Sequence, residues 1–208
     1  MAEWTNGLHR LVTIPAVYSW VQKTLGGPDA KGRIASRLFS GLAGKHVVEI
    51  GCGPGLWSDY LSHAASFTGI DRNPKHIEVA TSSYGSDRVR FLCGDLAHAD
   101  VISTVDNCDA VIAIGILHHL DDDIARDVLA QAAAVLRPHG VFIGLEPVYH
   151  GRQHPVARLL KLLDSGRNIR TEASYRALFN DDMRVETSIA TDLMRVPYSH
   201  CLIRGTRT

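Results

Sequence analysis

The stretch that decides the fold is Val47-Val48-Glu49-Ile50-Gly51-Cys52-Gly53-Pro54-Gly55. An apolar run that ends in an acidic residue and alternating glycines is typical of a buried strand, a tight turn and a following helix. Glycine has no Cβ, so it adopts positive φ freely and lets a ligand approach the backbone. Taken alone, the turn fits either a nucleotide-type ligand or a tight bend that binds nothing.

The spacing of the glycines argues against two common phosphate-binding turns. A dinucleotide-binding turn has the order G-x-G-x-x-G, but here Gly55 comes one residue early and Leu56 follows it. The Gly-Lys-Ser/Thr ending of a P-loop is also missing. Glu49, at the end of the strand, is unhelpful beside a pyrophosphate but suits a cation. The turn therefore favours a ligand with positive charge and no phosphate.

Two further carboxylates end the next apolar runs. Asp71 closes the second run, 22 residues after Glu49 (49 to 71), where a doubly wound fold holds a ribose diol. Asp95 closes the third run and can accept from an adenine amino group, while the amide of Leu96 can donate to a ring nitrogen. The alternative for each aspartate is a helix cap, which is a common use of Asp.

From Lys45 onward, short β-rich runs alternate with amphipathic segments, which predicts an α/β fold with a doubly wound, mostly parallel sheet. We expect strands at 46–50, 67–71, 89–93, 110–114 and 141–146, and an antiparallel pair at 184–191 and 200–204. We expect helices at 14–25, 31–42, 56–65, 75–82, 124–136, 156–163 and 172–178, and a short acidic segment near Asp100. Pro138-His139-Gly140 is expected to end the long helix and turn the chain into the fifth strand.

The three strand-end motifs, in this order, resemble the class I S-adenosylmethionine-dependent methyltransferase family, of the small-molecule, type 11/12-like kind. The resemblance rests on Glu49-x-Gly51-x-Gly53-x-Gly55, Asp71 and Gly94-Asp95, and it covers roughly residues 45–146. It implies a seven-stranded Rossmann-like sheet with an antiparallel last strand, S-adenosylmethionine as cofactor and S-adenosylhomocysteine as product. It also implies that the cofactor is bound by Glu49, Gly51, Cys52, Gly53, Gly55, Asp71, Arg72, Asp95, Leu96 and Ile114.

The 208 residues are expected to form one methyltransferase domain. Residues 1–44 would form a helical N-terminal lid over the cofactor cleft, residues 45–146 the cofactor-binding half, and residues 147–208 an acceptor-side insertion with the last two strands.

Histidines at the carboxyl ends of the fourth and fifth strands are the candidate catalytic residues. His118 and His119 follow the fourth strand and His150 follows the fifth, where pockets form in such sheets. A general base is needed only when the acceptor must lose a proton, as a hydroxyl does. The alternative for at least one of the neighbouring pair, His118 or His119, is a structural role.

Acceptor binding is expected from aromatic and basic residues near the same edge. Arginines in a loop can clamp a carboxylate or phosphate, and aromatic side chains can cover a cleft; solvated arginines and plain packing are the alternatives. The candidates are Tyr18, Trp20, Tyr149, Arg152, Arg167 and Arg170.

Composition narrows the class of partner. Lys and Arg together number 22, as do Asp and Glu, so no net charge attracts nucleic acid or an anionic membrane. The sequence has no run of about 20 apolar residues, so no membrane span is predicted. The four scattered cysteines lack metal-ligand spacing, so we expect reduced thiols, a cytoplasmic protein and no metal. A homodimer is compatible with the sequence.

The sequence thus predicts an enzyme that methylates oxygen, nitrogen or carbon of a small-molecule acceptor by in-line transfer. The main alternative is a regulatory protein that binds S-adenosylmethionine on the same fold without turnover. An RNA or protein methyltransferase would show a basic face or an Asn/Asp-Pro-Pro-aromatic motif after the fourth strand, where this chain has Ile-Gly-Ile-Leu-His-His. A metal-assisted enzyme would need clustered carboxylates, and Asp121 to Asp123 are better explained as a helix start.

Overall fold

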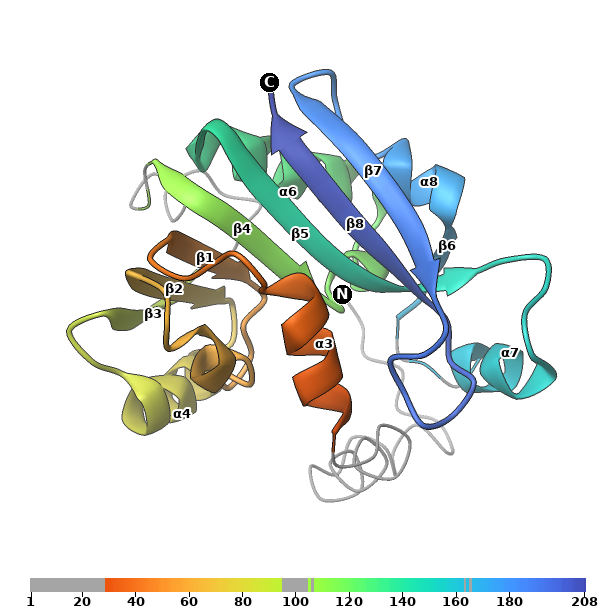
Figure 1. Ribbon diagram of the computed structural model, residues 1–208, viewed down its shortest axis with the longest axis horizontal. Coiled ribbons are helices and arrows are strands. Elements are labelled where there is room, and N and C mark those ends of the chain that lie inside the picture. The colour runs from red at the N-terminus through yellow and green to blue at the C-terminus, as the bar shows by residue number, and fades with distance from the viewer. Residues whose placement is uncertain (1–28, 95–104, 106, 163, 165) are drawn as a thin grey trace.

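The computed structural model describes residues 29–94, 105, 107–162, 164 and 166–208. In this part of the chain the strands form one twisted sheet in the order β3-β2-β1-β4-β5-β8-β7, with the short β6 paired to β5 (Figure 1). The strands are β1 (His46–Ile50), β2 (Ser66–Asp71), β3 (Val89–Cys93), β4 (Cys108–Ile114), β5 (Leu136–Tyr149), β6 (Arg170–Thr171), β7 (Met183–Ala190) and β8 (His200–Arg207).

The direction of each strand agrees with the expected α/β fold. β1 pairs in parallel with β2 and β4, β2 with β3, and β4 with β5. β8 is antiparallel to both β5 and β7 and lies between them, so the predicted antiparallel pair at the end of the chain is confirmed. The order reverses between β1 and β4, which is where open α/β sheets bind ligands.

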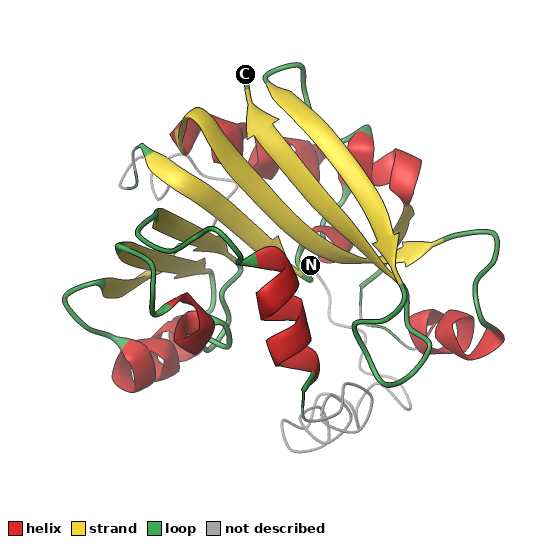
Figure 2. Cartoon of the chain, viewed as in Figure 1, coloured by secondary structure: helices red, strands yellow, loops and turns green. Residues whose placement is uncertain are grey.

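Helices cover both faces of the sheet (Figure 2). One apolar core packs α6 (Asp122–Val135) and α8 (Glu172–Arg176) on one face. The other core packs α3 (Ala30–Leu38), the 3-10 helix η1 (Ser58–Leu61) and α4 (Pro74–Tyr84) on the opposite face. The central strand β4 is almost wholly buried, as expected for a strand covered on both sides. The remaining elements are η2 (Leu117–His119), which follows β4, and α7 (Pro155–Leu162) in the insertion.

Two sequence expectations about local structure are wrong. The helix expected at 56–65 is reduced to η1, a single 3-10 turn at Ser58–Leu61. The expected turn at 138–140 lies inside the long strand β5, where His139 has φ +63° and the pairing to β4 jumps from Leu136 to Val141. Residues 137–140 have no partners in the register with β4, so the chain forms a bulge within β5.

Residues 29–44 are the described part of the segment that was expected to form an N-terminal lid. α3 buries Ala30, Ile34, Ala35 and Leu38 in the core of one face, and Arg33 donates to the carbonyl of Leu193 at 3.0 Å. It is a packing helix of the core. The helix expected at 14–25, with Tyr18 and Trp20, and the segment near Asp100 lie outside the described residues.

None of the helices in the described ranges combines the length and apolar character needed to cross a membrane.

Candidate functional site

The glycine turn between β1 and η1 requires glycine at three positions. Gly51, Gly53 and Gly55 have φ values of +69°, +53° and +81°, in the left-handed region that disfavours residues with a Cβ. The amides of Gly51 and Cys52 both donate to the carbonyl of Ile70, at 2.8 and 3.0 Å. These bonds fix the turn against the end of β2.

The space around the three glycines differs. A Cβ on Gly51 would lie 2.9 Å from Ile116, and one on Gly55 would lie 2.9 Å from Tyr84. A Cβ on Gly53 would meet no atom within 4 Å among the described residues. Gly51 and Gly55 are thus needed for packing inside the protein, whereas Gly53 presents bare backbone to open space that a ligand can occupy.

Asp71 is tied to this turn and does not cap α4. Its Oδ2 accepts from the amide of Gly53 at 2.9 Å, and its Oδ1 accepts from the amide of Asn73 at 2.8 Å. The N-cap of α4 is Asn73, whose side chain accepts from the amide of Lys75 at 3.0 Å. The Asp71 side chain remains 14% exposed, so a carboxylate at the end of β2 faces the open side of the glycine turn.

Glu49 is a buried carboxyl group with an unsatisfied oxygen. Its residue is 1% exposed, and its Oε2 has no hydrogen-bond partner among the described residues. Burial, with the nearby charge of Asp71, raises the pKa of Glu49 to about 8. A cationic group beside it would favour the ionised form and satisfy the orphaned oxygen.

These features fit S-adenosylmethionine, which carries an ammonium and a sulfonium. The Gly53 backbone gives close approach, Asp71 offers acceptor oxygens for hydroxyls, and Glu49 offers an unpaired oxygen for a cation. Cys52 can contribute only backbone, because its side chain is buried against Gly69, and burial raises the pKa of its thiol well above the usual range. Ile114, at the end of β4, is half-buried and Arg72 is exposed; Asp95 and Leu96 lie outside the described residues.

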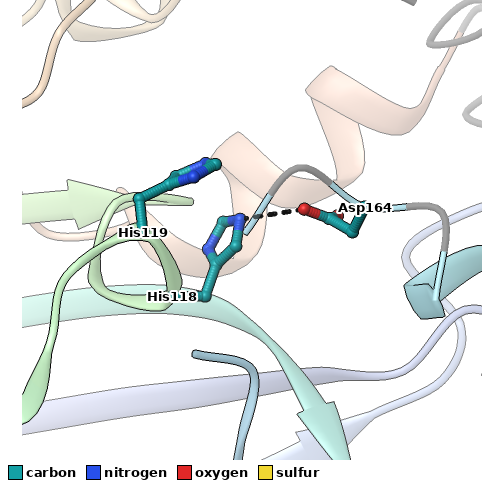
Figure 3. Close-up of side chains that lie close together, drawn as sticks. All are labelled: His118, His119 and Asp164. Atoms are coloured by element: carbon teal, nitrogen blue, oxygen red, sulfur yellow. Dashed lines mark ion pairs between the residues drawn. The ribbon is translucent and has the colours of Figure 1, made fainter. Parts of the chain in front are cut away.

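A second group of side chains lies at the carboxyl ends of β4 and β5 (Figure 3). Glu146 of β5 is fully buried and its Oε2 lies 2.6 Å from Nδ1 of His118. The same carboxylate accepts from the amides of Ile116, Leu117 and His118, at 3.0, 2.8 and 3.2 Å. Glu146 therefore fixes both the backbone of η2 and the ring of His118. The sequence offered one sign of it, a charged residue inside an apolar strand.

The other ring nitrogen of His118 faces a residue that the sequence did not single out. Nε2 lies 3.4 Å from Oδ1 of Asp164, which also accepts from the amide of Gly166 at 2.8 Å. A Cβ on Gly166 would overlap the ring of His118, so this position needs glycine. Nothing in the sequence pairs Asp164 with His118, because the two residues lie 46 positions apart (118 to 164).

The two neighbouring histidines differ in protonation. Burial lowers the pKa of His118, but its contacts with the carboxylates of Asp164 and Glu146 outweigh this and raise it to about 9. The pKa of His119 is lowered by burial and by the charge of His118. The rings lie 4.0 Å apart between centroids. Without another cation, His118 is protonated at neutral pH and His119 is neutral.

Arg170 is a structural residue rather than an acceptor ligand. Its guanidinium donates to the carbonyls of Leu117, Leu120 and Asn168 and, through Nε and Nη2, to the carboxylate of Asp122. These bonds use all five of its N–H groups. The expectation that Arg170 clamps a substrate is therefore corrected: it holds η2 and the start of α6 in place.

The other acceptor-side candidates do not form one cluster. Nε2 of His150 lies 2.9 Å from Oγ of Ser199, and the Tyr149 ring lies 5.7 Å from Nζ of the buried Lys161. Arg152 and Arg167 are exposed. The structure brings together the rings of His118 and His119, whereas His150 pairs with Ser199.

Comparisons with known proteins find methyltransferases. Residues 47–140 match the family model described as "Methyltransferase domain". A ubiquinone biosynthesis O-methyltransferase of Coxiella burnetii is 32% identical over 104 residues, which span 48% of this chain and 42% of that protein. A phthiotriol/phenolphthiotriol dimycocerosates methyltransferase of Mycobacterium leprae is 33% identical over 102 residues, covering 48% and 36%.

The likeness in fold extends further than the likeness in sequence. The magnesium protoporphyrin IX methyltransferase of Synechocystis PCC 6803, solved with bound SAH, superposes with a TM-score of 0.60 at 19% identity, covering 100% of this chain and 90% of that chain. This chain spans less than half the length of the two curated relatives. Residues 47–140 thus match a methyltransferase domain, and the fold around them is the fold of that solved methyltransferase.

Proposed function

We propose that this protein transfers a methyl group from S-adenosylmethionine to oxygen, nitrogen or carbon of a small-molecule acceptor. The observation that carries the proposal is the open space beside the Gly53 backbone. The Gly53 amide donates to Asp71, and the unpaired oxygen of Glu49 lies nearby. Equal numbers of acidic and basic residues favour a small molecule over a nucleic acid as acceptor.

Three residues at and beside the glycine turn have separate roles in this proposal. Gly53 admits the methyl donor to the backbone, Asp71 accepts from its ribose hydroxyls, and Glu49 stabilises positive charge. Asp95 and Leu96 are proposed to read the adenine. S-adenosylmethionine supplies an electrophilic methyl group on its sulfonium, so the protein mainly aligns donor and acceptor.

The acceptor side is proposed to lie at η2, because Ile116 packs against Gly51 of the donor turn. Of the candidate histidines there, His118 is held between two carboxylates and is a poor base. His119 is exposed and neutral, so its ring is available to a proton or to a cation. His150, Tyr149, Arg152 and Arg167 remain candidates for acceptor contacts.

Calorimetry with S-adenosylhomocysteine tests the donor site. We expect binding by the wild type and a loss of about tenfold or more in affinity for Asp71→Asn, because the variant loses a charged acceptor. Asp87→Asn, at an exposed turn before β3, is the matched control and should bind like the wild type. No binding by the wild type, or equal binding by Asp71→Asn, would contradict the proposal.

Turnover is tested separately by incubating the protein and S-adenosylmethionine with fractionated metabolites and measuring release of S-adenosylhomocysteine. Release that depends on one fraction supports an enzyme. Binding of S-adenosylhomocysteine with no release from any fraction supports the alternative of a regulatory protein that binds the cofactor without turnover.

A further inference from the structure

We propose that His118, His119 and Asp164 bind a divalent transition-metal ion of the Zn²⁺ class. One potential ligand atom from each of the three residues lies within 4.8 Å of the others. Figure 3 shows the two imidazoles and the carboxylate around one point, with Asp164 reaching across from the insertion to η2. The proposal concerns ion binding alone and does not rest on methyl transfer.

The distances suit a small ion. Zn²⁺ holds nitrogen and oxygen ligands at about 2.0–2.2 Å, so two ligand atoms in a tetrahedral site lie roughly 3.3 Å apart. Nε2 of His118 and Oδ1 of Asp164 are 3.4 Å apart. The remaining ligand atom belongs to His119, which is exposed and can turn about its side-chain bonds. Closing the site therefore needs a movement of roughly 1.5 Å at most.

The surroundings of His118 favour a positive charge at its Nε2. Nδ1 is paired with Glu146 at 2.6 Å, so Nε2 is the ring nitrogen left for another ligand. Nε2 faces a second carboxylate, that of Asp164. A neutral imidazole would direct its Nε2 lone pair at Asp164, which is repulsive, so either a proton or a metal ion belongs there. His119 places a third potential ligand atom beside that nitrogen, which a metal ion can use and a proton shared by His118 and Asp164 does not need.

The groups behind the three ligands resemble the supporting groups of protein metal sites. A carboxylate on the outer nitrogen of a metal-binding histidine fixes its orientation and raises its basicity, and Glu146 is placed to do this. Asp164 is oriented in the same way, by the amide of Gly166 at 2.8 Å and by the hydroxyl of Tyr198, which donates to Oδ2 at 3.3 Å. His118 and Asp164 are thus held in position before an ion binds.

The backbone that carries the histidines is also fixed from both sides. Glu146 binds the amides of residues 116–118, and Arg170 binds the carbonyls of Leu117 and Leu120. The amide of Asn168 donates to the carbonyl of His118 at 2.9 Å. Such clamping fixes the backbone that carries both imidazoles, which lowers the entropy lost on binding an ion.

The donor set selects the class of ion. Two imidazoles and one carboxylate suit Zn²⁺ and similar ions, whereas Mg²⁺ and Ca²⁺ prefer all-oxygen sites. Three protein ligands with one exposed side leave a coordination position for water or another oxygen. The sequence does not predict this site, since Asp164 is far from the histidines along the chain and the expected metal signal was a cluster of carboxylates.

The test is titration of the chelator-treated protein with ZnCl₂ by calorimetry, with Co²⁺ absorption as a report of ligand geometry. We expect one Zn²⁺ per chain with a Kd below roughly 10 μM, and no comparable binding of Mg²⁺. His119→Ala and Asp164→Asn should each weaken Zn²⁺ binding by about tenfold or more, and the exposed control His63→Ala should stay within about twofold of wild type.

Two results would overturn the proposal. Absence of stoichiometric Zn²⁺ binding would mean that His118 simply carries a proton between two carboxylates. Equal binding by the wild type, His119→Ala and Asp164→Asn would place the ion elsewhere. Because no methyl donor is present, failure here leaves the S-adenosylhomocysteine experiment unaffected, and failure of that experiment leaves this one unaffected.

Discussion

Nδ1 of His118 lies 2.6 Å from the buried carboxylate of Glu146, across the ends of β4 and β5. The same carboxylate accepts from three successive backbone amides. A buried carboxylate is stable only when its oxygens are satisfied, and here the η2 turn and the His118 ring satisfy them. This pairing organises the carboxyl ends of β4 and β5.

Replacing Glu146 should therefore destabilise the whole domain. In Glu146→Ala, three amides and Nδ1 of His118 lose their acceptor inside the protein, so we expect a loss of about 3 kcal/mol or more in the free energy of unfolding. Urea denaturation followed by circular dichroism measures this. Glu78→Ala, on the exposed face of α4, is the control and should change it by less than about 0.5 kcal/mol. A similar small change in Glu146→Ala would show that these bonds contribute little.

Replacing Arg170 distinguishes a structural role, in which it holds η2 and α6 together, from a role in binding the substrate. Arg170→Lys keeps the charge but cannot reproduce the planar set of bonds to Leu117, Leu120 and Asp122. We expect a loss of about 2 kcal/mol in the free energy of unfolding in the absence of any ligand. Arg158→Lys, at an exposed site on α7, should be close to neutral. Unchanged stability of Arg170→Lys, together with a raised KM for an acceptor, would restore the ligand role.

Gly53 and Gly44 form a matched pair for testing the donor turn. Both have positive φ, +53° and +69°, and neither would bring a Cβ within 4 Å of another described atom. Alanine at either position should lower stability by about 1 kcal/mol through backbone strain. Only Gly53→Ala fills the space assigned to the donor, so it alone should weaken S-adenosylhomocysteine binding, by about tenfold or more in calorimetry. Equal affinities for the two variants would mean that the ligand does not approach Gly53.

Glu49 makes the stability of the ligand-free protein depend on pH. Burial raises its pKa to about 8, from 4.5 in the unfolded chain. Between these values the folded state binds more protons than the unfolded state, so stability falls as pH rises through this window and levels off above it. Glu49→Gln removes the titrating group. Its Tm, measured by scanning calorimetry from pH 5 to pH 8.5, should fall less than that of the wild type. Parallel curves for the two proteins would show that Glu49 is ionised throughout in the fold.

How far the sequence predicted the structure varies with how local the signal is. The turn at residues 51–55 was predictable, because glycine is the residue that adopts the positive φ of such a turn without strain. The antiparallel end of the sheet was predictable from a short connection. The helix expected at 56–65 was wrong, because the segment forms only a 3-10 turn at Ser58–Leu61.

By itself, the sequence determined the α/β class, the glycine turn and the place of Asp71 at the end of a strand, since each depends on residues close in the chain or on the regular alternation of strands and helices. Only the tertiary structure decided what surrounds the histidines. It turned Arg170 inward, buried Glu146 against His118 and brought Asp164 to 3.4 Å from that ring. Contacts between residues far apart in sequence follow from how layers pack, and no local pattern encodes them.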